Sequence, residues 1–583
     1  MKTQDALLSQ SEQRREDLER RWKSWTPRTT AQLLDNIAQT NPDRPMIVTD
    51  ERTYSYADVA DLSTRLAAGL YSIGIRTGDH VAVVMANFPH AVALKFAVAR
   101  LGAVSVSINF MLRHEELGYV LGQSRASVLI TMDEFRGLDY GLELDQLIPG
   151  WEDRGGGQVL PDLRDVFVFG TAGSQPSRGR SVDDLIALGA TVSDETIAEL
   201  TASIDPDSTS DLVYTSGTTG KPKGVMLRHD AILRTAYSCA YTRALSDGYR
   251  ILYALPLYHV FGYVEATIAT MFVGGSTVPQ CTFNAMQTLR AVEEHKPDEI
   301  MCVPAMTSVL LDEAETSSYD LSSLSTVFSS GARHAPGMFD RIKKAFGVDR
   351  VFTAYGQTET TASTLCTRPE DPTEVLSQTN GTVKPAGLAG YPELGGALAI
   401  YKVVDPQTGE DLPAGEVGEL IVRGPIITRG YYDKPEQTAE MFTRGDWMRT
   451  GDLGRLSKDG YLTLTGRQKE SYRFGGELVI PSDVEEVLNE HPGVLEAHVI
   501  GVPHDRWGEV GCAWVVANPD AVPEAAELIE YCSTRLARFK VPAIVLFIDA
   551  AELPRTVTGR VQKFHLVQRA VEHVAARDKT AAS

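Results

Sequence analysis

The chain has 583 residues, of which 43% are hydrophobic and 23% are charged, values typical of a folded protein and not of a disordered or collagen-like chain. Its formal net charge of -21 argues against non-specific binding to nucleic acids or anionic membranes, because the summed field repels a polyanion. The six cysteines have no CxxC spacing and the N-terminus has no apolar signal core, so we expect a cytoplasmic protein with free thiols, no zinc site and no membrane insertion.

Helical and strand patterns alternate in the first part of the chain. The apolar residues of 59–70 fall on one helical face, and 80–85 is a short apolar run. Residues 103–108 and 127–131 are also strand-like and each follows a helical segment, which predicts a mostly parallel sheet covered by helices. Residues 151–181 are rich in Gly, Pro, Asp and Ser, and we interpret them as a surface insertion.

The pattern changes twice further along. A second alternating series covers 210–355, and after about residue 381 short strands separated by Gly and Pro turns predict a small β-subdomain over 381–466. A last module follows, in which Ser482 and Glu485 have the spacing of a helix capping box. We therefore expect an α/β protein with a large N-terminal domain, 1–467, of helix-covered, mostly parallel sheets plus the β-subdomain, and a small α+β C-terminal domain, 468–583, joined by a hinge.

The segment 214–229 has the composition of a polyphosphate cradle. It combines hydroxyl donors, glycines that let a backbone approach an anion, and lysines. These residues are Thr215, Ser216, Gly217, Thr218, Thr219, Gly220, Lys221, Lys223 and Gly224. A generic flexible loop is the ordinary interpretation of such a composition. A Walker P-loop is disfavoured, because Lys221 is followed by Pro222 and the glycine spacing is wrong.

The residue order of 214–229 resembles the signature of the adenylate-forming superfamily, which contains acyl-CoA synthetases, beetle luciferases and nonribosomal adenylation domains. Further motifs of that superfamily follow in the expected order from Tyr54 to the C-terminus, so the resemblance covers nearly the whole chain. Residues 256–262 resemble the segment whose histidine, here His259, borders the path of the carboxylate and the thiol. A single histidine among apolar residues is otherwise more often a core residue.

Two further segments resemble the loops that enclose the adenine and close one wall of the acyl pocket. The resemblance implies nucleotide binding by Gly331, Ala332, Tyr355, Gly356, Gln357 and Thr358. It also implies that Glu359 holds Mg2+, an ion that takes carboxylate oxygens together with substrate phosphates. The acyl pocket would be lined by Tyr258, Phe261, Val303, Met306 and His334.

The C-terminal motifs resemble the ribose, hinge and thiol-tunnel elements of the superfamily. Asp452 can accept from ribose hydroxyls and Arg467 can donate to ribose or phosphate. Lys469 corresponds to the pivot of the mobile domain, and Gly475 and Gly476 to the segment that lines the pantetheine tunnel. Taken alone, the last two residues are equally typical of a hairpin turn.

The last motif departs from the superfamily pattern. The superfamily has Pro-x-x-x-x-Gly-Lys, and its lysine approaches the carboxylate and the α-phosphate during adenylation. This chain has Arg560 after Gly559 at that position, and the resemblance implies the same catalytic role for Arg560. Arginine keeps the charge but spreads it over a planar fork, so the exchange is not conservative for a point-charge contact. We expect slower adenylation, or partial substitution by Lys563.

The resemblance implies an AMP-forming ligase that adenylates a carboxylic acid with Mg-ATP, releases pyrophosphate, and transfers the acyl group to coenzyme A. Fatty and aromatic acids are both open as substrates. Two alternatives also remain: an enzyme whose acceptor is a carrier-protein thiol, an amine or a small inorganic nucleophile, and a non-catalytic acyl- or nucleotide-binding relative that has lost turnover through Arg560.

Overall fold

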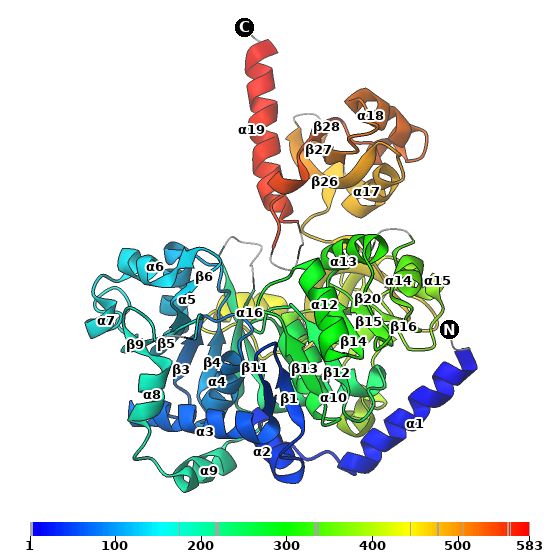
Figure 1. Ribbon diagram of the computed structural model, residues 1–583. Coiled ribbons are helices and arrows are strands. Elements are labelled where there is room, and N and C mark those ends of the chain that lie inside the picture. The colour runs from blue at the N-terminus through cyan, green and yellow to red at the C-terminus, as the bar shows by residue number, and fades with distance from the viewer. Residues whose placement is uncertain are drawn as a thin grey trace. The chain divides into compact units, whose positions relative to one another are not determined.

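The computed structural model in Figure 1 describes residues 4–173, 175–215, 221–331, 334, 337–443, 445–474, 477–504, 507–556, 559 and 561–581. Two compact units are formed by interleaved parts of the chain. Unit 1 consists of Met1–Ile400 and Arg423–Met448, and unit 2 of Tyr401–Val422 and Arg449–Ser583. The predicted α/β fold with helix-covered, mostly parallel sheets is confirmed, whereas the predicted domain division at Gln468 stays a prediction. In the described part of the chain, no helix is both long and apolar enough to span a membrane.

The first large sheet of unit 1 has the strand order β16-β15-β14-β12-β13-β1-β2. All neighbours are parallel except β1 and β2. Short strands such as β14 and β15 are buried along their whole length, as expected for a sheet with both faces covered. The strands are β1 (Pro45–Val48), β2 (Thr53–Ser55), β12 (Arg250–Tyr253), β13 (Ser276–Pro279), β14 (Glu299–Cys302), β15 (Thr326–Ser329) and β16 (Arg350–Phe352).

Helices that lie against this sheet in Figure 1 include α10 (His229–Thr242), α12 (Ala285–His295), α13 (Pro304–Thr316) and α14 (Met338–Phe346). The apolar faces of α12, α13 and α14 and the strands share one buried cluster that contains Leu289, Leu310, Ile342 and Val327. Unit 1 also contains the helices α1 (Gln4–Trp22), α11 (Ala269–Met271), α15 (Thr373–Gln378) and α16 (Pro435–Met441).

The second large sheet has the order β11-β10-β4-β3-β5-β8-β9, parallel except for the hairpin β10–β11. Its strands are β3 (His80–Val83), β4 (Val104–Ser107), β5 (Val128–Met132), β8 (Asp165–Phe169), β9 (Arg180–Ser181), β10 (Thr209–Thr215) and β11 (Lys223–Arg228). The expected surface insertion at 151–181 thus contains β8, whose central residues are buried between β5 and β9.

Among the helices around the second sheet, several begin at side-chain caps. Thr29, Ser55 and Ser181 form reciprocal capping boxes with the third residue of their helices. The helices are α2 (Thr30–Thr40), α3 (Tyr56–Ser72), α4 (Pro89–Arg100), α5 (His114–Ser124), α6 (Tyr140–Leu147), α7 (Trp151–Arg154), α8 (Val182–Leu188) and α9 (Asp194–Ser203). Short strand pairings complete unit 1: β6 (Glu134–Phe135) with β7 (Leu138–Asp139), and β17 (Ala354–Gly356), β18 (Ser363–Cys366) and β19 (Thr382–Val383).

Unit 2 contains two smaller sheets. One has four strands in sequence order, β20 (Ile400–Val404), β21 (Gly418–Arg423), β22 (Met448–Leu456) and β23 (Leu462–Arg467). The other contains β24 (Tyr472–Phe474), β25 (Glu477–Val479), β26 (Val494–His504), β27 (Gly508–Ala517) and β28 (Ile544–Phe547), with α17 (Pro481–Asn489), α18 (Ala525–Ser533) and α19 (Lys563–Ala581).

The capping box predicted at Ser482 and Glu485 is wrong. Helix α17 has Ile480 at its N-cap and Pro481 at its first position, where proline is favoured because its missing N–H is not needed. The Ser482 hydroxyl donates to the Thr465 carbonyl, and the Glu485 carboxylate accepts from the backbone N–H of Val499.

Candidate active site

Several predicted site residues leave the carboxyl ends of neighbouring strands in the first sheet of unit 1. His259 follows β12, Val303 follows β14 and Gly331 follows β15. Strands β14 and β15 are parallel with Cys302 opposite Ser329, so the segments that follow them start side by side. In open α/β sheets, ligands bind outside the carboxyl ends of the strands, and this edge is therefore the first place to look for a site.

The two expected adenine loops are joined at their starting points. The Ser330 hydroxyl donates to the Ala354 carbonyl at 2.8 Å and accepts from the Ala354 N–H at 3.1 Å. Gly331 then adopts a φ of +99°, a conformation that favours glycine. Beyond Ala354, Tyr355 and Gly356 lie on β17, Gln357 caps the next turn, and Thr358 and Glu359 lie on the 3-10 helix Thr358–Thr360. Ala332 lies outside the described residues.

The segment that carries Tyr258 and His259 is held by a residue that sequence reasoning missed. The Asn87 amide donates to the Leu255 and Gln280 carbonyls and accepts from the Leu257 N–H, all at 2.9 Å, and only 3% of the residue is exposed. Asn87 precedes α4 and has no motif of its own, so only the tertiary structure identifies it.

His259 stands two residues before a π-helix, Phe261–Ile268, whose N-cap is Val260. Its Nδ1 accepts from the Phe261 N–H at 3.2 Å, and burial lowers the pKa of the ring to about 4. The imidazole is therefore neutral near pH 7. π-Helical turns are rare and are found frequently at functional sites.

The expected acyl-pocket residues make contacts at the same edge of the sheet. The Phe261 ring packs edge-on against Phe328 of β15 at 5.3 Å, and Tyr258 packs against Phe110 at 5.5 Å. His334 Nε2 lies 2.9 Å from the Ser329 hydroxyl, and burial lowers the pKa of His334 to about 4. Val303 and Met306 open helix α13, Val303 as its N-cap. These side chains are mostly apolar, which suits the body of an organic acid.

The expected phosphate loop connects the two strands of the β10–β11 hairpin. Thr215 is paired with Lys223 and Tyr214 with Gly224 in this hairpin, whereas Ser216, Gly217, Thr218, Thr219 and Gly220 lie outside the described residues. A Cβ at Gly224 would lie 3.1 Å from the Tyr214 ring, so the glycine permits a close approach of that ring.

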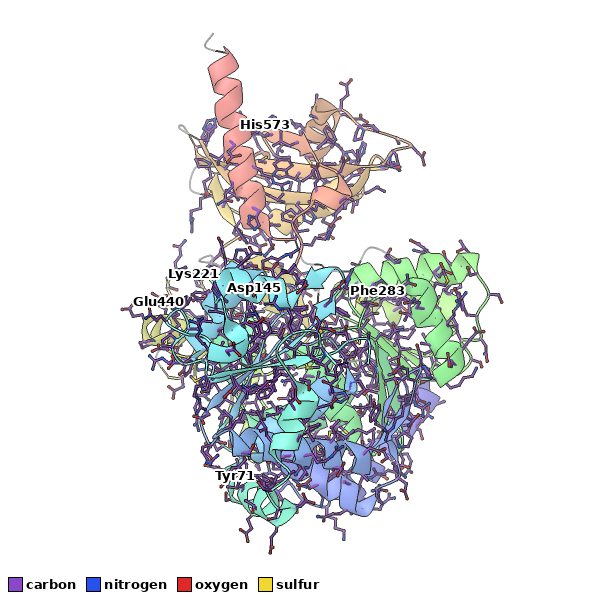
Figure 2. The ribbon with its side chains drawn as sticks, turned by 60° about the vertical axis from the view of Figure 1, so that its left-hand side comes forward. Tyr71, Asp145, Lys221, Phe283, Glu440 and His573 are labelled. Carbon is purple, nitrogen blue, oxygen red and sulfur yellow. The ribbon has the colours of Figure 1, made fainter. Side chains whose placement is uncertain are left out.

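The two lysines of this loop lie over aromatic rings. Lys221, labelled in Figure 2, has its Nζ 5.3 Å from the centre of the Tyr119 ring, and Lys223 has its Nζ 4.7 Å from the Tyr431 ring. The Tyr119 hydroxyl also donates to the Pro222 carbonyl at 3.2 Å. The aromatic faces thus accommodate the ammonium groups in this structure.

Glu359 is connected to the same tyrosine. The Tyr431 hydroxyl donates to Glu359 Oε1 at 2.8 Å, and the backbone N–H of Thr428 donates to the Glu359 carbonyl at 2.8 Å. A single partly buried carboxylate beside a phosphate loop fits Mg2+, which takes one or two protein carboxylates and completes its shell with phosphates and water. A lysine of the loop and the predicted metal ligand thus contact one side chain, Tyr431, which sequence reasoning missed.

In unit 2, the two expected ribose residues face each other across a strand pair. Asp452 on β22 is opposite Arg467 on β23, and Arg467 Nε lies 2.9 Å from Asp452 Oδ1. Asp452 is buried, and its backbone N–H donates to the Thr450 hydroxyl at 3.1 Å. The structure therefore brings this predicted pair together.

The hinge and the C-terminal motif are described only in part. Lys469 lies in the turn after β23, where the Gln468 N–H donates to the Gly451 carbonyl at 3.0 Å. Gly475, Gly476 and Arg560 lie outside the described residues. Lys563 opens α19 and donates to Glu485 Oε1 at 2.6 Å.

Unit 2 also has a cavity of about 590 Å³ that the sequence did not predict. Phe474 and Trp507 stack on its wall with ring centres 4.9 Å apart and an interplanar angle of 17°. The lining residues are Phe474, His504, Trp507, Val510, Ile529, Ser533, Arg538, Val541, Pro542 and Ala543. Val541 and Pro542 of this wall follow directly after the 3-10 helix Arg538–Lys540.

Comparison with known proteins decides the family. The model of the "AMP-binding enzyme" family matches residues 34–432, and that of the "AMP-binding enzyme C-terminal domain" matches residues 483–560. The chain belongs to the AMP-binding enzyme family. The predicted membership of the acyl-CoA synthetase branch of the adenylate-forming enzymes is likewise confirmed.

Named relatives of this family member align over nearly its whole length. The medium-chain acyl-CoA ligase ACSF2 of Danio rerio is 31% identical over 93% of this chain and 88% of its own. A Mycobacterium tuberculosis ligase named for 3-[(3aS,4S,7aS)-7a-methyl-1,5-dioxo-octahydro-1H-inden-4-yl]propanoyl:CoA is 32% identical over 92% of this chain and 98% of its own.

Solved structures of the family show the same fold. ATP-bound MatB from Rhodopseudomonas palustris is 27% identical, with a TM-score of 0.79 over 93% of this chain and 99% of its own. The anthranilate CoA ligase AuaEII, in complex with anthranoyl-AMP, is 26% identical, with a TM-score of 0.79 over 95% of this chain and 99% of its own.

Proposed function

We propose that this protein is an AMP-forming acid–CoA ligase that activates an apolar carboxylic acid as its adenylate. The observation that carries the proposal is the contact of Lys223 and Glu359 with the same Tyr431 side chain. A cation of the phosphate loop and a carboxylate suited to Mg2+ are thereby held in one place, as the polyphosphate of Mg-ATP requires. The family and its named ligases support the same activity.

In the first half-reaction, the carboxylate of the acid attacks the α-phosphorus of ATP and expels pyrophosphate. Lys221 and Lys223 offset negative charge on the departing pyrophosphate. Glu359 would hold Mg2+, which would supply further charge neutralisation. Loop residues around Gly331 and Tyr355 enclose the adenine, and the pair Asp452 and Arg467 holds the ribose. No protein nucleophile is needed, so positioning and charge neutralisation supply the acceleration.

The acid lies along His259 in this proposal. Since burial keeps the pKa of His259 near 4, the ring is neutral at pH 7 and contributes hydrogen bonding instead of charge to the carboxylate path. The other acyl-pocket residues, Tyr258, Phe261, Val303, Met306 and His334, receive the body of the acid. Apolar fatty, aryl and alicyclic acids are the substrates to test first.

In the second half-reaction, the C-terminal domain pivots at Lys469 and presents Gly475 and Gly476 to the thiol arm of coenzyme A. We place the nucleotide end of coenzyme A on the unit 2 cavity. Its aromatic pair, Phe474 and Trp507, offers a stacking surface for adenine, and Arg538 offers a cation for phosphate.

The six cysteines are free thiols, which fits a reducing compartment such as the cytoplasm.

The decisive experiment is acid-dependent pyrophosphate release from Mg-ATP, measured over a panel of fatty, benzoic, cinnamic and fused-ring alicyclic acids. Release with one class of acid supports adenylation and identifies the substrate. Absence of release from the wild-type protein, with ATP still bound and with activity in Arg560→Lys, would instead favour a non-catalytic binding protein. Product formation with coenzyme A, a carrier protein or an amine then identifies the acceptor.

The acceptor site has its own test. Trp507→Ala should raise the KM for coenzyme A by roughly 10-fold, the loss expected for one stacking partner of about 1–3 kcal/mol, and leave pyrophosphate release unchanged. Phe547→Ala is the matched control, because Phe547 is a similarly exposed aromatic residue of unit 2 that does not line the cavity. An unchanged KM for coenzyme A in Trp507→Ala would show that the nucleotide end of coenzyme A does not bind in this cavity.

A further inference from the structure

A short loop, residues 428–432, joins the β10–β11 hairpin, which carries the expected phosphate loop, to the turn that carries Glu359. We refer to it as the bracing loop. On the hairpin side, the Tyr432 N–H donates to the Gly224 carbonyl at 2.8 Å and the Thr428 hydroxyl donates to the Met226 carbonyl at 2.7 Å. On the other side, the Thr428 N–H donates to the Glu359 carbonyl at 2.8 Å. The loop therefore fixes the backbones of both functional segments to each other.

The bracing loop is also anchored behind the hairpin. Gln123 of α5 donates from Nε2 to the Tyr432 carbonyl at 2.7 Å, and the Tyr432 ring packs edge-on against His80 at 4.8 Å. Since Gln123 also accepts a hydrogen bond from the Tyr214 hydroxyl, one amide joins the bracing loop to strand β10. The loop is thus held on two sides and gives its side chains a defined position.

Tyr431 is the side chain of this loop that reaches the predicted polyphosphate site. Its hydroxyl donates to Glu359 Oε1 at 2.8 Å and its ring lies 4.7 Å from Lys223 Nζ. The hydroxyl is the donor and the carboxylate oxygen the acceptor, so this contact engages one of the two Glu359 oxygens.

We propose that Tyr431 is a positioning residue that orders the Glu359 carboxylate and the Lys223 ammonium for Mg-ATP. This inference rests on the proposed function and assigns one residue a double role at its polyphosphate site. Glutamate and lysine side chains lose rotamer freedom when they bind a ligand, and partners that order them beforehand reduce that cost. The phenol engages one oxygen of the carboxylate, in the manner of the outer-shell partners that orient metal ligands.

Two substitutions separate the two roles. Tyr431→Phe removes the hydrogen bond to Glu359 and keeps the ring beside Lys223, whereas Tyr431→Leu removes both. The matched control is Tyr319→Phe, because the Tyr319 hydroxyl donates to Glu313 Oε1 at 2.5 Å at a position outside the predicted site. All three variants remove a phenol hydroxyl bonded to a glutamate, and only two of them do so beside the phosphate loop.

The first readout is Mn2+ binding to the full-length protein in the presence of a non-hydrolysable ATP analogue, followed by the electron paramagnetic resonance of free Mn2+. We expect Tyr431→Phe to weaken Mn2+ binding by about 10- to 100-fold, the usual effect of removing an outer-shell partner. Metal-free binding of the analogue should be weakened by Tyr431→Leu and unchanged in Tyr431→Phe. Tyr319→Phe should match the wild type in both measurements, and thermal unfolding checks that each variant is folded.

The outcomes distinguish this inference from the proposed function. Unchanged Mn2+ affinity in a folded Tyr431→Phe variant would overturn the positioning role, even if the wild-type enzyme releases pyrophosphate with an acid. Weakened Mn2+ binding in Tyr431→Phe, together with no turnover of any acid by the wild type, would support the positioning role and reject the ligase. A general loss of stability in Tyr431→Phe without a change in metal binding would show that the residue only packs the loop.

Discussion

Replacing Asn87 by alanine tests how the segment before His259 is held. The substitution removes three hydrogen bonds of 2.9 Å and leaves the Leu255 and Gln280 carbonyls and the Leu257 N–H without their partner. At about 1 kcal/mol of net free energy for each bond, the loss is about 3 kcal/mol. A change of that size shifts an equilibrium by roughly 10²-fold. We expect the loss to be divided between global stability and the local order of the segment.

The assay is acid-dependent pyrophosphate release, with thermal unfolding measured on the same samples. Asn87→Ala should raise the KM for the acid and lower the rate of adenylation, because Tyr258 and His259 follow directly after the released segment, while the KM for ATP stays at the wild-type value. Asn518→Ala, which removes an exposed amide hydrogen bond in unit 2, is the control and should change neither quantity. An Asn87→Ala variant with a wild-type KM for the acid and a wild-type unfolding temperature would refute the reasoning.

Two further predictions concern pH and the phosphate hairpin. His229 is fully buried, and burial lowers its pKa to about 4 from an unfolded value near 6.5. The unfolded state therefore binds the additional proton, and the stability of the folded state falls as the pH drops from 6.5 towards 4. The unfolding temperature of His229→Gln should fall less over this range, and equal pH dependence in both proteins would contradict the assignment. Gly224→Ala places a methyl group 3.1 Å from the Tyr214 ring and should raise the KM for ATP in pyrophosphate release without affecting that for the acid, so an unchanged KM for ATP would show that the hairpin tolerates the shift.

The sequence predicted the large-scale fold because its signals are local. Short apolar strands alternate with amphipathic helices in both halves of unit 1, and periodicity is sufficient to detect them. Helix α1 was missed, although its buried residues Leu7, Ser11 and Leu18 recur at helical spacing. Their apolar character is weak among many charges, and the helix is stabilised mainly by tertiary contacts, such as the bond from Trp22 Nε1 to the Phe272 carbonyl at 2.9 Å.

The site was predictable only where a motif is continuous in sequence. Lys223, Glu359 and His259 each lie in such a motif. Tyr431 and Asn87 do not, since Tyr431 contacts a residue 72 positions away and Asn87 one 168 positions away. The π-helix after His259 was equally hidden, because its residues are buried on all sides and an apolar run of that kind has the same pattern as a buried α-helix or strand.

The contacts of Lys563 favour a structural role within unit 2 over the predicted partial substitution for the superfamily lysine, which stays a prediction. Its Nζ lies 2.6 Å from Glu485 Oε1 and 3.6 Å from Glu470 Oε2, with only 12% of the side chain exposed. Lys563→Met would remove an ammonium group from between two partly buried carboxylates, and we expect unit 2 to lose about 1–3 kcal/mol of stability.

Adenylation by the folded fraction of Lys563→Met should therefore change little, whereas Arg560→Ala should slow it by roughly 10²- to 10³-fold, as for other charge-stabilising groups. The measurement is the single-turnover rate of pyrophosphate release, corrected for the folded fraction, in Lys563→Met, Arg560→Ala and Arg560→Lys. Glu485→Gln is the companion variant, because it weakens the same ion pair from its other side. If Lys563→Met slows the chemical step as much as Arg560→Ala and Arg560→Lys restores it, then Lys563 leaves its carboxylates during the reaction and the charge at the α-phosphate is shared between the two residues.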